Sequence, residues 1–303
     1  MDDTLERLVR FRELGKVAPR VTGAVLDELR AMSAATIDRY LKPHKDAAYP
    51  VALSGTRPSL ILRSSIPTRT SMDDPMTCPG FLELDTVAHC GHTLKGEFLR
   101  TMTATDPVTG WTMLRTIRNN AMHVHGALEW ILKYAPVPVA GMDFDNGSEF
   151  MNWGVIAWAD RHEIPLTRSR PYKHNDNAHV EQRNGDWVRK HAFRYRYETE
   201  AEMALLNELW GLVMARKNHL LPCVKAVAWT HTTAGRKKRV YDQPHTPYQR
   251  LLDAGALDAK TRARLEREHA TLNPAKISRR INQIQHQLIE LASARTLGTR
   301  PAA

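Results

Sequence analysis

The 303-residue sequence has few cysteines and no long apolar run. Its three cysteines cannot form a disulfide framework, which excludes a disulfide-stapled secreted fold and predicts a reducing, intracellular setting. A run of about 18 apolar residues is missing, and the acidic start MDDTLERL lacks the features of a signal peptide, so we expect no membrane association. No internal repeat occurs at a solenoid period, which excludes a repeat architecture.

Acidic residues are scarce in only one half of the chain. Residues 166–303 hold 25 Lys and Arg against 13 Asp and Glu, a net charge of +12. Residues 1–165 hold 18 against 20, a net charge of −2. Lys and Arg that contact phosphates release condensed counterions, so a basic half is typical of a protein that binds an extended polyanion. A role in solubility alone is the alternative.

Two segments precede the main part of the chain. Residues 1–42 are predicted to form short helices, with Ser33 as the N-cap of a helix over 34–42. The corner at 31–33 fits either a helix-turn-helix that presents Thr36 and Arg39 to DNA or a plain helical hairpin, and both remain open. Residues 43–79 hold six prolines among Ser and Thr and are predicted to be a linker.

Residues 80–216 change to alternating strand and helix patterns. Strands are expected over 81–89, 97–105, 111–117, 136–145 and 164–168, and helices over 120–134, 149–162, 177–195 and 200–216. The order β-β-β-α-β-α-β-α predicts an α/β fold with a mixed five-stranded sheet and helices on both faces. It is the order of the ribonuclease H-like fold.

The C-terminal part is predicted to be mostly helical. Residues 217–255 are expected to be a basic, irregular region, and 256–303 to form two helices. The last helix begins with Asn273 as N-cap and Pro274 at the first position. Five apolar residues then follow at steps of four and three: Ile277, Ile281, Ile284, Leu288 and Leu291. We expect this seam to pack on its own chain, with self-association as the alternative.

Three carboxylates are distinguished by their positions. Asp85 lies within the first predicted strand, Asp145 ends the fourth, and Glu181 lies in the first turn of a long helix. Carboxylates that converge above a sheet edge repel one another unless a hard cation neutralises them. Two Mg²⁺ ions about 3.5–4 Å apart can activate one oxygen and stabilise the leaving oxygen of an in-line displacement. Scattered carboxylates can mimic such a set, so their spacing matters.

Two motifs resemble a known family. The stretches Met142–Phe150 (MDFDNGSEF) and Asn175–Asn184 (NDNAHVEQRN) are similar to the second and third signatures of the D,D-35-E integrases and insertion-sequence transposases. Asp145 and Glu181 are separated by 35 residues, whereas Asp143 would give 37. Leu82–Thr86 (LELDT) resembles the first signature. The resemblance covers about residues 80–245, and Glu83 is the weaker alternative to Asp85.

The resemblance implies a transposase or integrase that cleaves DNA strands and transfers them. Asp85, Asp145 and Glu181 would hold two Mg²⁺ ions, with Mn²⁺ able to substitute, and no covalent protein–DNA intermediate would form. The expected partner is double-stranded DNA, bound by a homo-oligomer. Candidate DNA contacts, for which a solvated surface is the alternative, are Asn146, Arg183, Asn184, Arg189, Lys190, Arg236, Lys237, Lys238 and Arg239.

The chain departs from retroviral integrases in one respect. Those proteins carry an N-terminal His/Cys zinc module, whereas residues 1–80 offer only His44 and Cys78. The run His89–His92 (HCGH) is too compressed for a tetrahedral site, so we expect no zinc. Three other functions remain open: a ribonuclease H-like nuclease that does not join strands, a catalytically silent DNA-binding relic or regulator, and an RNA-binding or scaffolding protein.

Overall fold

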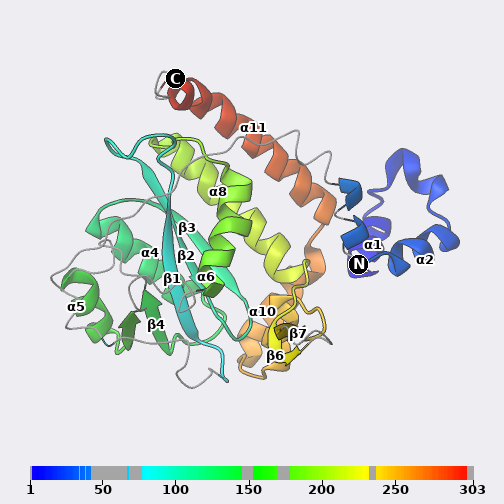
Figure 1. Ribbon diagram of the computed structural model, residues 1–303, viewed down its shortest axis with the longest axis horizontal. Helices are drawn as coiled ribbons and strands as arrows, with labels where there is room; N and C mark the ends of the chain where they lie inside the picture. Colours follow the sequence, from blue (N-terminus) through cyan, green and yellow to red (C-terminus); the bar gives the residue numbers. More distant parts are fainter. Residues whose placement is uncertain are drawn as a thin grey trace.

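The computed structural model describes residues 2–33, 35–37, 39–41, 67, 77–144, 153–168, 178–231 and 237–298. Its centre is a five-stranded sheet with the order β3-β2-β1-β4-β5 (Figure 1). The strands are β1 (Phe81–Ala88), β2 (Leu99–Thr105), β3 (Thr112–Arg118), β4 (Gly141–Phe144) and β5 (Leu166–Arg168). The first three strands pair antiparallel, and β4 and β5 run parallel to β1. This order and these directions confirm the predicted ribonuclease H-like sheet.

Helices cover both faces of the sheet. On one face, α4 (Ala121–Tyr134) and α5 (Trp153–Arg161) bury a core that includes Leu84, Leu128 and Trp158. The other face is covered by α6 (Ala178–Arg183), the π-helical segment η3 (Asn184–Arg189), α7 (Lys190–Ala192), α8 (Glu200–His219) and α11 (Pro274–Gly298). The helix that carries Glu181 therefore lies on this second side.

Two predicted boundaries in the sheet region were wrong. The fourth strand begins at Gly141 rather than Pro136, because Pro136 and Pro138 have no N–H to donate to a neighbouring strand. A Cβ at Gly141 would lie 2.6 Å from the Phe81 ring, so glycine lets β4 approach β1. The helix expected over 177–195 is divided into α6, η3 and α7 and ends at Ala192, after which Phe193 has a φ of 57°.

The region 217–255 is more ordered than predicted. It contains the antiparallel hairpin of β6 (Ala226–His231) and β7 (Lys237–Tyr241), followed by α9 (Pro247–Asp253). Thr246 and Gln249 form a reciprocal capping box at the start of α9, with proline at its first turn. The capping residues and the proline of α9 are readable in the sequence. The basic run at 236–239 does not by itself indicate a strand.

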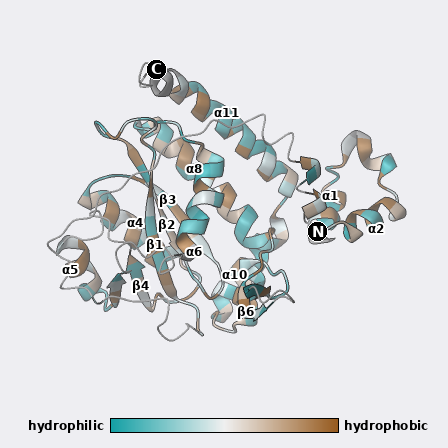
Figure 2. Ribbon diagram, viewed as in Figure 1, coloured by the Kyte–Doolittle hydropathy of each residue, from teal (hydrophilic) through white to brown (hydrophobic). Residues whose placement is uncertain are grey.

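The last helix follows its prediction closely. Asn273 Oδ1 accepts from the backbone N–H groups of Ala275 and Lys276, which confirms the predicted N-cap. α10 (Ala259–Thr271) precedes it. Four members of the predicted seam are buried, namely Ile277, Ile281, Ile284 and Leu288, and they belong to the same core as residues of α8. Leu291 is 48% exposed and Ala292 is buried, so the seam turns at its end. The packed helices α8 and α11 each carry both hydrophilic and hydrophobic residues (Figure 2).

The N-terminal helices dock on the C-terminal ones (Figure 1). They are α1 (Asp2–Arg10), the 3-10 helix η1 (Gly15–Arg20) and α2 (Gly23–Ala31). The buried Arg7 side chain donates to the carbonyl oxygens of His269 at 2.7 Å and Leu272 at 3.2 Å. Ser33 Oγ accepts from the N–H of Thr36, as expected of an N-cap, and the helix-turn-helix stays a prediction. Most of the predicted linker lies outside the described residues.

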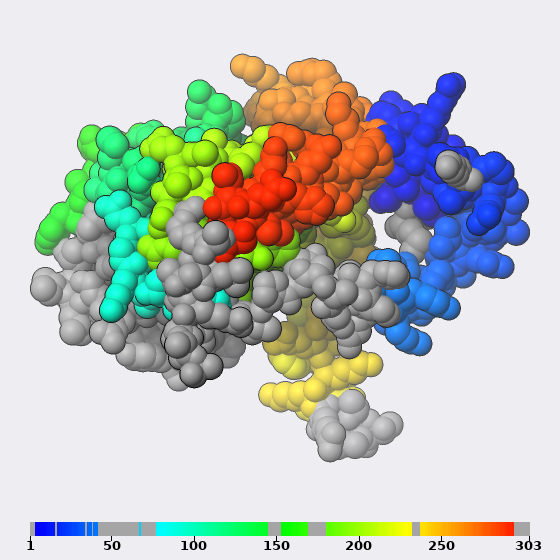
Figure 3. All heavy atoms as spheres, turned by 90° about the horizontal axis from the view of Figure 1, so that it is seen from above, coloured from blue at the N-terminus to red at the C-terminus, as the bar shows by residue number. Residues whose placement is uncertain are grey.

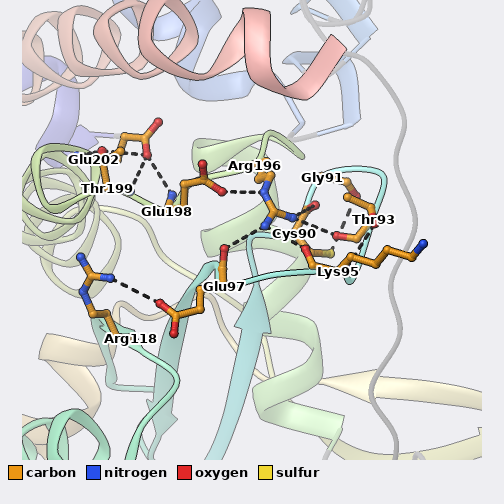
Figure 4. A network of polar contacts seen from close by, with 10 residues as sticks. All are labelled: Cys90, Gly91, Thr93, Lys95, Glu97, Arg118, Arg196, Glu198, Thr199 and Glu202. Carbon is orange, nitrogen blue, oxygen red and sulfur yellow. Dashed lines mark hydrogen bonds and ion pairs between the residues drawn. The ribbon is translucent and has the colours of Figure 1, made fainter. Parts of the chain in front are cut away.

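A buried arginine fixes the connection between β1 and β2 (Figure 4). Arg196, 6% exposed, donates to four backbone carbonyl oxygens, those of Cys90, Thr93, Lys95 and Glu97, at 2.8 to 3.4 Å. Its Nε also donates to Glu198 at 2.7 Å. The guanidinium therefore organises the loop between the two strands. Within the described part of the chain, no helix is long and apolar enough to cross a membrane.

Candidate active site on the central strands

Alternation along β1 separates polar from apolar side chains. Leu82 and Leu84 point into the core below α4 and α5, while Glu83, Asp85 and Val87 lie on the opposite face. Glu83 is 4% exposed and Asp85 is half-buried. The strand thus presents two carboxylates to the side covered by α6 and η3.

Asp85 is held at both of its carboxylate oxygens. Oδ1 accepts from the backbone N–H of Thr86 at 2.6 Å, and Oδ2 accepts from Asn184 Nδ2 at 2.5 Å. Asn184 is the first residue of η3 and is 2% exposed, so its amide faces the carboxylate rather than the outer surface. Its Oδ1 is buried without a hydrogen-bond partner. An acceptor of this kind beside a carboxylate suits a cation or its water.

The start of α6 is attached to β1. The N–H of Val180 donates to Glu83 Oε2 at 3.2 Å. Glu83, considered from the sequence only as a weaker alternative to Asp85, therefore satisfies one of the N–H groups that a helix start leaves unpaired. This hydrogen bond places Glu181, the next residue, near β1. Alternation put Glu83 and Asp85 on one face, but no sequence signal linked Glu83 to α6.

Glu181 and Asp85 both act on one guanidinium. Glu181 is exposed on α6, and Arg189 ends η3. Burial lowers the pKa of Arg189, and the carboxylates of Asp85 and Glu181 partly offset this by attraction. Two of the three predicted carboxylates thus exert an attraction on Arg189, a cation predicted to contact DNA.

The third predicted carboxylate, Asp145, lies outside the described residues, as does Asn146. The description of β4 ends at Phe144, which pairs with Leu84 in the parallel register. Asp143, which the 35-residue spacing disfavoured, is 2% exposed, pairs with Glu83 and accepts from Thr167 Oγ1. It is thus bonded to the neighbouring strand.

The other predicted DNA contacts lie in different surroundings. Arg183 stands over the Trp187 ring at 5.4 Å and donates to Cys223 Sγ at 3.9 Å, and the exposed Lys190 pairs with Asp186 at 2.7 Å. Three residues of the basic run are exposed on β7, namely Lys237, Lys238 and Arg239, whereas Arg236 lies outside the described residues.

The run His89–His92 is engaged within the protein. His89 is buried, its Nε2 lies 2.7 Å from Thr101 Oγ1, and burial lowers its pKa to about 3. Among the described residues, no group of three or more His, Cys, Asp or Glu side chains is placed to hold a metal ion. That set does not contain Asp145.

The chain is similar to a curated protein and to solved structures. No family model matches the chain. An uncharacterized protein of Sinorhizobium fredii, y4rM, is 37% identical over 227 residues, which make up 74% of this chain. The chain spans 64% of the length of that relative. The catalytic core domain of BIV integrase is 16% identical, with 58% of this chain and 95% of that chain covered, at a TM-score of 0.38. A TM-score this low relates the two only loosely, so the fold class rests on strand order and direction.

Proposed function

We propose that the chain is a DDE-type transposase or integrase, which cleaves DNA strands and transfers them at Asp85, Asp145 and Glu181. The observation that carries the proposal is the attachment of α6 and η3 to the carboxylate face of β1, where Asn184 donates to Asp85 and the N–H of Val180, the residue before Glu181, donates to Glu83. The sequence resemblance, with 35 residues between Asp145 and Glu181, supports it independently.

The register of the sheet supports Asp145 as the third carboxylate. Leu84 pairs with Phe144 in parallel, and an aspartate follows each of these two residues in the sequence. Residues in register on neighbouring strands share a face. Asp145 itself lies outside the described residues, so its proposed role rests on this sequence position and on the resemblance. Asp143, two residues before Asp145 in the sequence, pairs with Glu83 on one side and with Thr167 on the other.

The donor set fits magnesium. Carboxylate oxygens are the protein ligands that Mg²⁺ prefers, and the unpartnered Oδ1 of Asn184 beside Asp85 adds a neutral acceptor. Asp85, Asp145 and Glu181 would hold two Mg²⁺ ions, for which Mn²⁺ would substitute. Bound there, the ions would supply Lewis-acid stabilisation of the attacking and leaving oxygens of an in-line displacement.

The residues of the chain have separate tasks in this proposal. Asn184 fixes the orientation of Asp85, and Glu83 fixes the start of the helix that carries Glu181. Arg189 balances the carboxylates and, with Lys190, offers positive charge to the phosphates of double-stranded DNA. Transposition joins two DNA ends to a target, so we expect a homo-oligomer on DNA.

The test is metal-dependent nicking and joining of DNA that carries the ends of the element around the gene. We expect joined products from the wild type, and a loss of at least roughly a hundredfold in Asp145→Asn and Glu181→Gln, because metal stabilisation of the displacement is worth several kcal/mol. Glu290→Gln is the matched control, since it neutralises an exposed glutamate on α11.

Each other result has a definite meaning. Full activity in Asp145→Asn, purified free of contaminating nuclease, excludes the proposal. Metal-dependent nicks without joined products identify a ribonuclease H-like nuclease. DNA binding without any cleavage identifies a regulatory protein.

A further inference from the structure

The β6–β7 hairpin differs from every other strand pair in its exposure. All residues of β6 and β7 are exposed, including Trp229 at 61% and Tyr241 at 51%. Figure 3 shows the hairpin, in yellow, standing out from the body of the molecule. An isolated two-stranded hairpin is at best marginally stable in water, and an uncovered tryptophan adds to the apolar surface left in contact with solvent.

The charge of the hairpin indicates what covers it. From Leu221 to Tyr241 the sequence has no Asp or Glu and five Lys or Arg. A segment with this composition is repelled by other basic surfaces and attracted to a polyanion. Its aromatic residues add apolar and stacking surface, which bases and sugars can use.

Register places Trp229 and two of the basic side chains, Lys237 and Arg239, on one face. Trp229 lies opposite Arg239, and His231 lies opposite Lys237. Directly opposed residues of an antiparallel pair point to the same side, as do residues two apart on a strand. The Arg239 guanidinium stands over the Trp229 ring at 5.2 Å. The other face carries Ala228, Thr230, Lys238 and Val240.

The base of the hairpin is firmly attached to the core. Asp242 accepts from the N–H of Lys225 and from Arg250, each at 2.6 Å, and Lys225 Nζ donates to the carbonyl oxygen of Val108 at 2.6 Å. Arg183, two residues after Glu181, reaches Cys223 at this base. The hairpin is therefore an arm whose root contacts the helix that bears the proposed catalytic glutamate.

We propose that the β6–β7 hairpin is a DNA-binding ribbon that enters the major groove of the duplex on which the carboxylate site acts. The inference rests on the proposed function for the identity of that duplex. The major groove of B-DNA admits a two-stranded β-ribbon, and both edges of this one are free of other strands in the described structure. One face of the ribbon meets base edges and the adjoining phosphates, and it carries Trp229, His231, Lys237 and Arg239.

The experiment measures binding of the full chain to a labelled duplex in EDTA, where cleavage is absent. We expect Lys237→Ala/Arg239→Ala to raise the Kd at least tenfold and to reduce the slope of log K against log salt by about 1.8, or about 0.9 for each phosphate that the variant no longer neutralises. Trp229→Ala should raise the Kd without changing the salt slope. The control Lys260→Ala/Arg267→Ala removes the same charge from exposed positions on α10 and should change the Kd less than twofold.

A second duplex tests the groove. Glucosylated 5-hydroxymethylcytosine fills the major groove with bulky groups, so it should weaken the wild type and leave the doubly substituted hairpin variant unaffected. Equal affinities of the hairpin and control variants would overturn the inference. A wild type that binds the filled duplex as tightly as the plain one would overturn the groove assignment.

Failure of this inference is distinguishable from failure of the proposed function. If the hairpin variants lose affinity for DNA but neither the wild type nor any variant nicks it, the DNA-binding inference is supported and the proposed strand-transfer function is excluded. If nicking depends on Glu181 but the hairpin variants bind DNA as tightly as the control variant, the proposed function is supported and the DNA-binding inference is excluded.

Discussion

The packed body of the molecule and the exposed β6–β7 hairpin use positive charge in opposite ways. Arg196, Lys217 and Arg250 have side chains at most 13% exposed, and each donates to carboxylates or to backbone carbonyl oxygens. On the hairpin, Lys237, Lys238 and Arg239 are all exposed.

The difference shows how to separate structural from binding cations in a basic protein. A buried cation that satisfies internal acceptors stabilises the fold, and its removal leaves those acceptors unpaired. An exposed cation contributes little to stability and remains available for phosphates. Buried cations therefore stabilise the fold and exposed cations can bind phosphates, and measurements of unfolding free energy can distinguish the two groups.

The largest expected effect is at Arg196. Arg196→Met removes the guanidinium that donates to four carbonyl oxygens and to Glu198, and we expect a loss of about 3–5 kcal/mol in the free energy of unfolding by urea. Arg194→Met, which changes an exposed neighbour, is the control and should cost less than about 0.5 kcal/mol. Equal losses in the two variants would remove the proposed distinction.

A smaller loss is expected at Lys217. Burial raises the pKa of Asp186, but hydrogen bonds from Lys190 and Lys217 outweigh it and hold the pKa at about 2. Asp186 is partly exposed, so Lys217→Met should cost only about 1–2 kcal/mol at neutral pH. A depressed pKa means that this stability is present above the unfolded pKa of about 3.9 and is lost as the pH falls toward 2. Urea unfolding of both proteins from pH 5 to pH 2 should therefore show the two curves converging, and a constant gap would contradict the prediction.

Acid should weaken the sheet region through a buried histidine. Burial lowers the pKa of His89 to about 3, so the unfolded chain takes up a proton below about pH 6.5 that the folded chain does not. This uptake should lower the free energy of unfolding by about 1 kcal/mol for each pH unit as the pH falls from 6.5 to 4. His89→Asn should show a correspondingly flatter dependence in thermal unfolding, and a slope equal to that of the wild type would contradict the prediction.

The smallest effect is expected on the hairpin. Arg239→Ala removes a guanidinium that lies over Trp229 on an exposed face, so the free energy of unfolding should change by less than about 0.5 kcal/mol. Circular dichroism with urea measures this change. A loss as large as that of Lys217→Met would mean that the hairpin cations are structural.

Local patterns predicted much of the fold. The alternation in β1, the N-cap at Asn273 and the order of strands and helices along the chain were all readable, because each depends on residues close in sequence. The start of β4, the division of the long helix and the hairpin were missed. Propensity does not show where a π-helical turn interrupts a helix, and a basic run does not distinguish a strand from a loop.

The sequence alone determined the types of side chain and their faces. Period-two alternation put Glu83 and Asp85 on one side of β1, and the resemblance to the D,D-35-E family made Asp145 and Glu181 the predicted partners of Asp85. Tertiary structure decided their hydrogen-bond partners, with Asn184 donating to Asp85 and the N–H of Val180 donating to Glu83. It also left every residue of β6 exposed. Those hydrogen bonds join residues almost a hundred positions apart, and only the packing of helices on the sheet brings such residues within bonding distance.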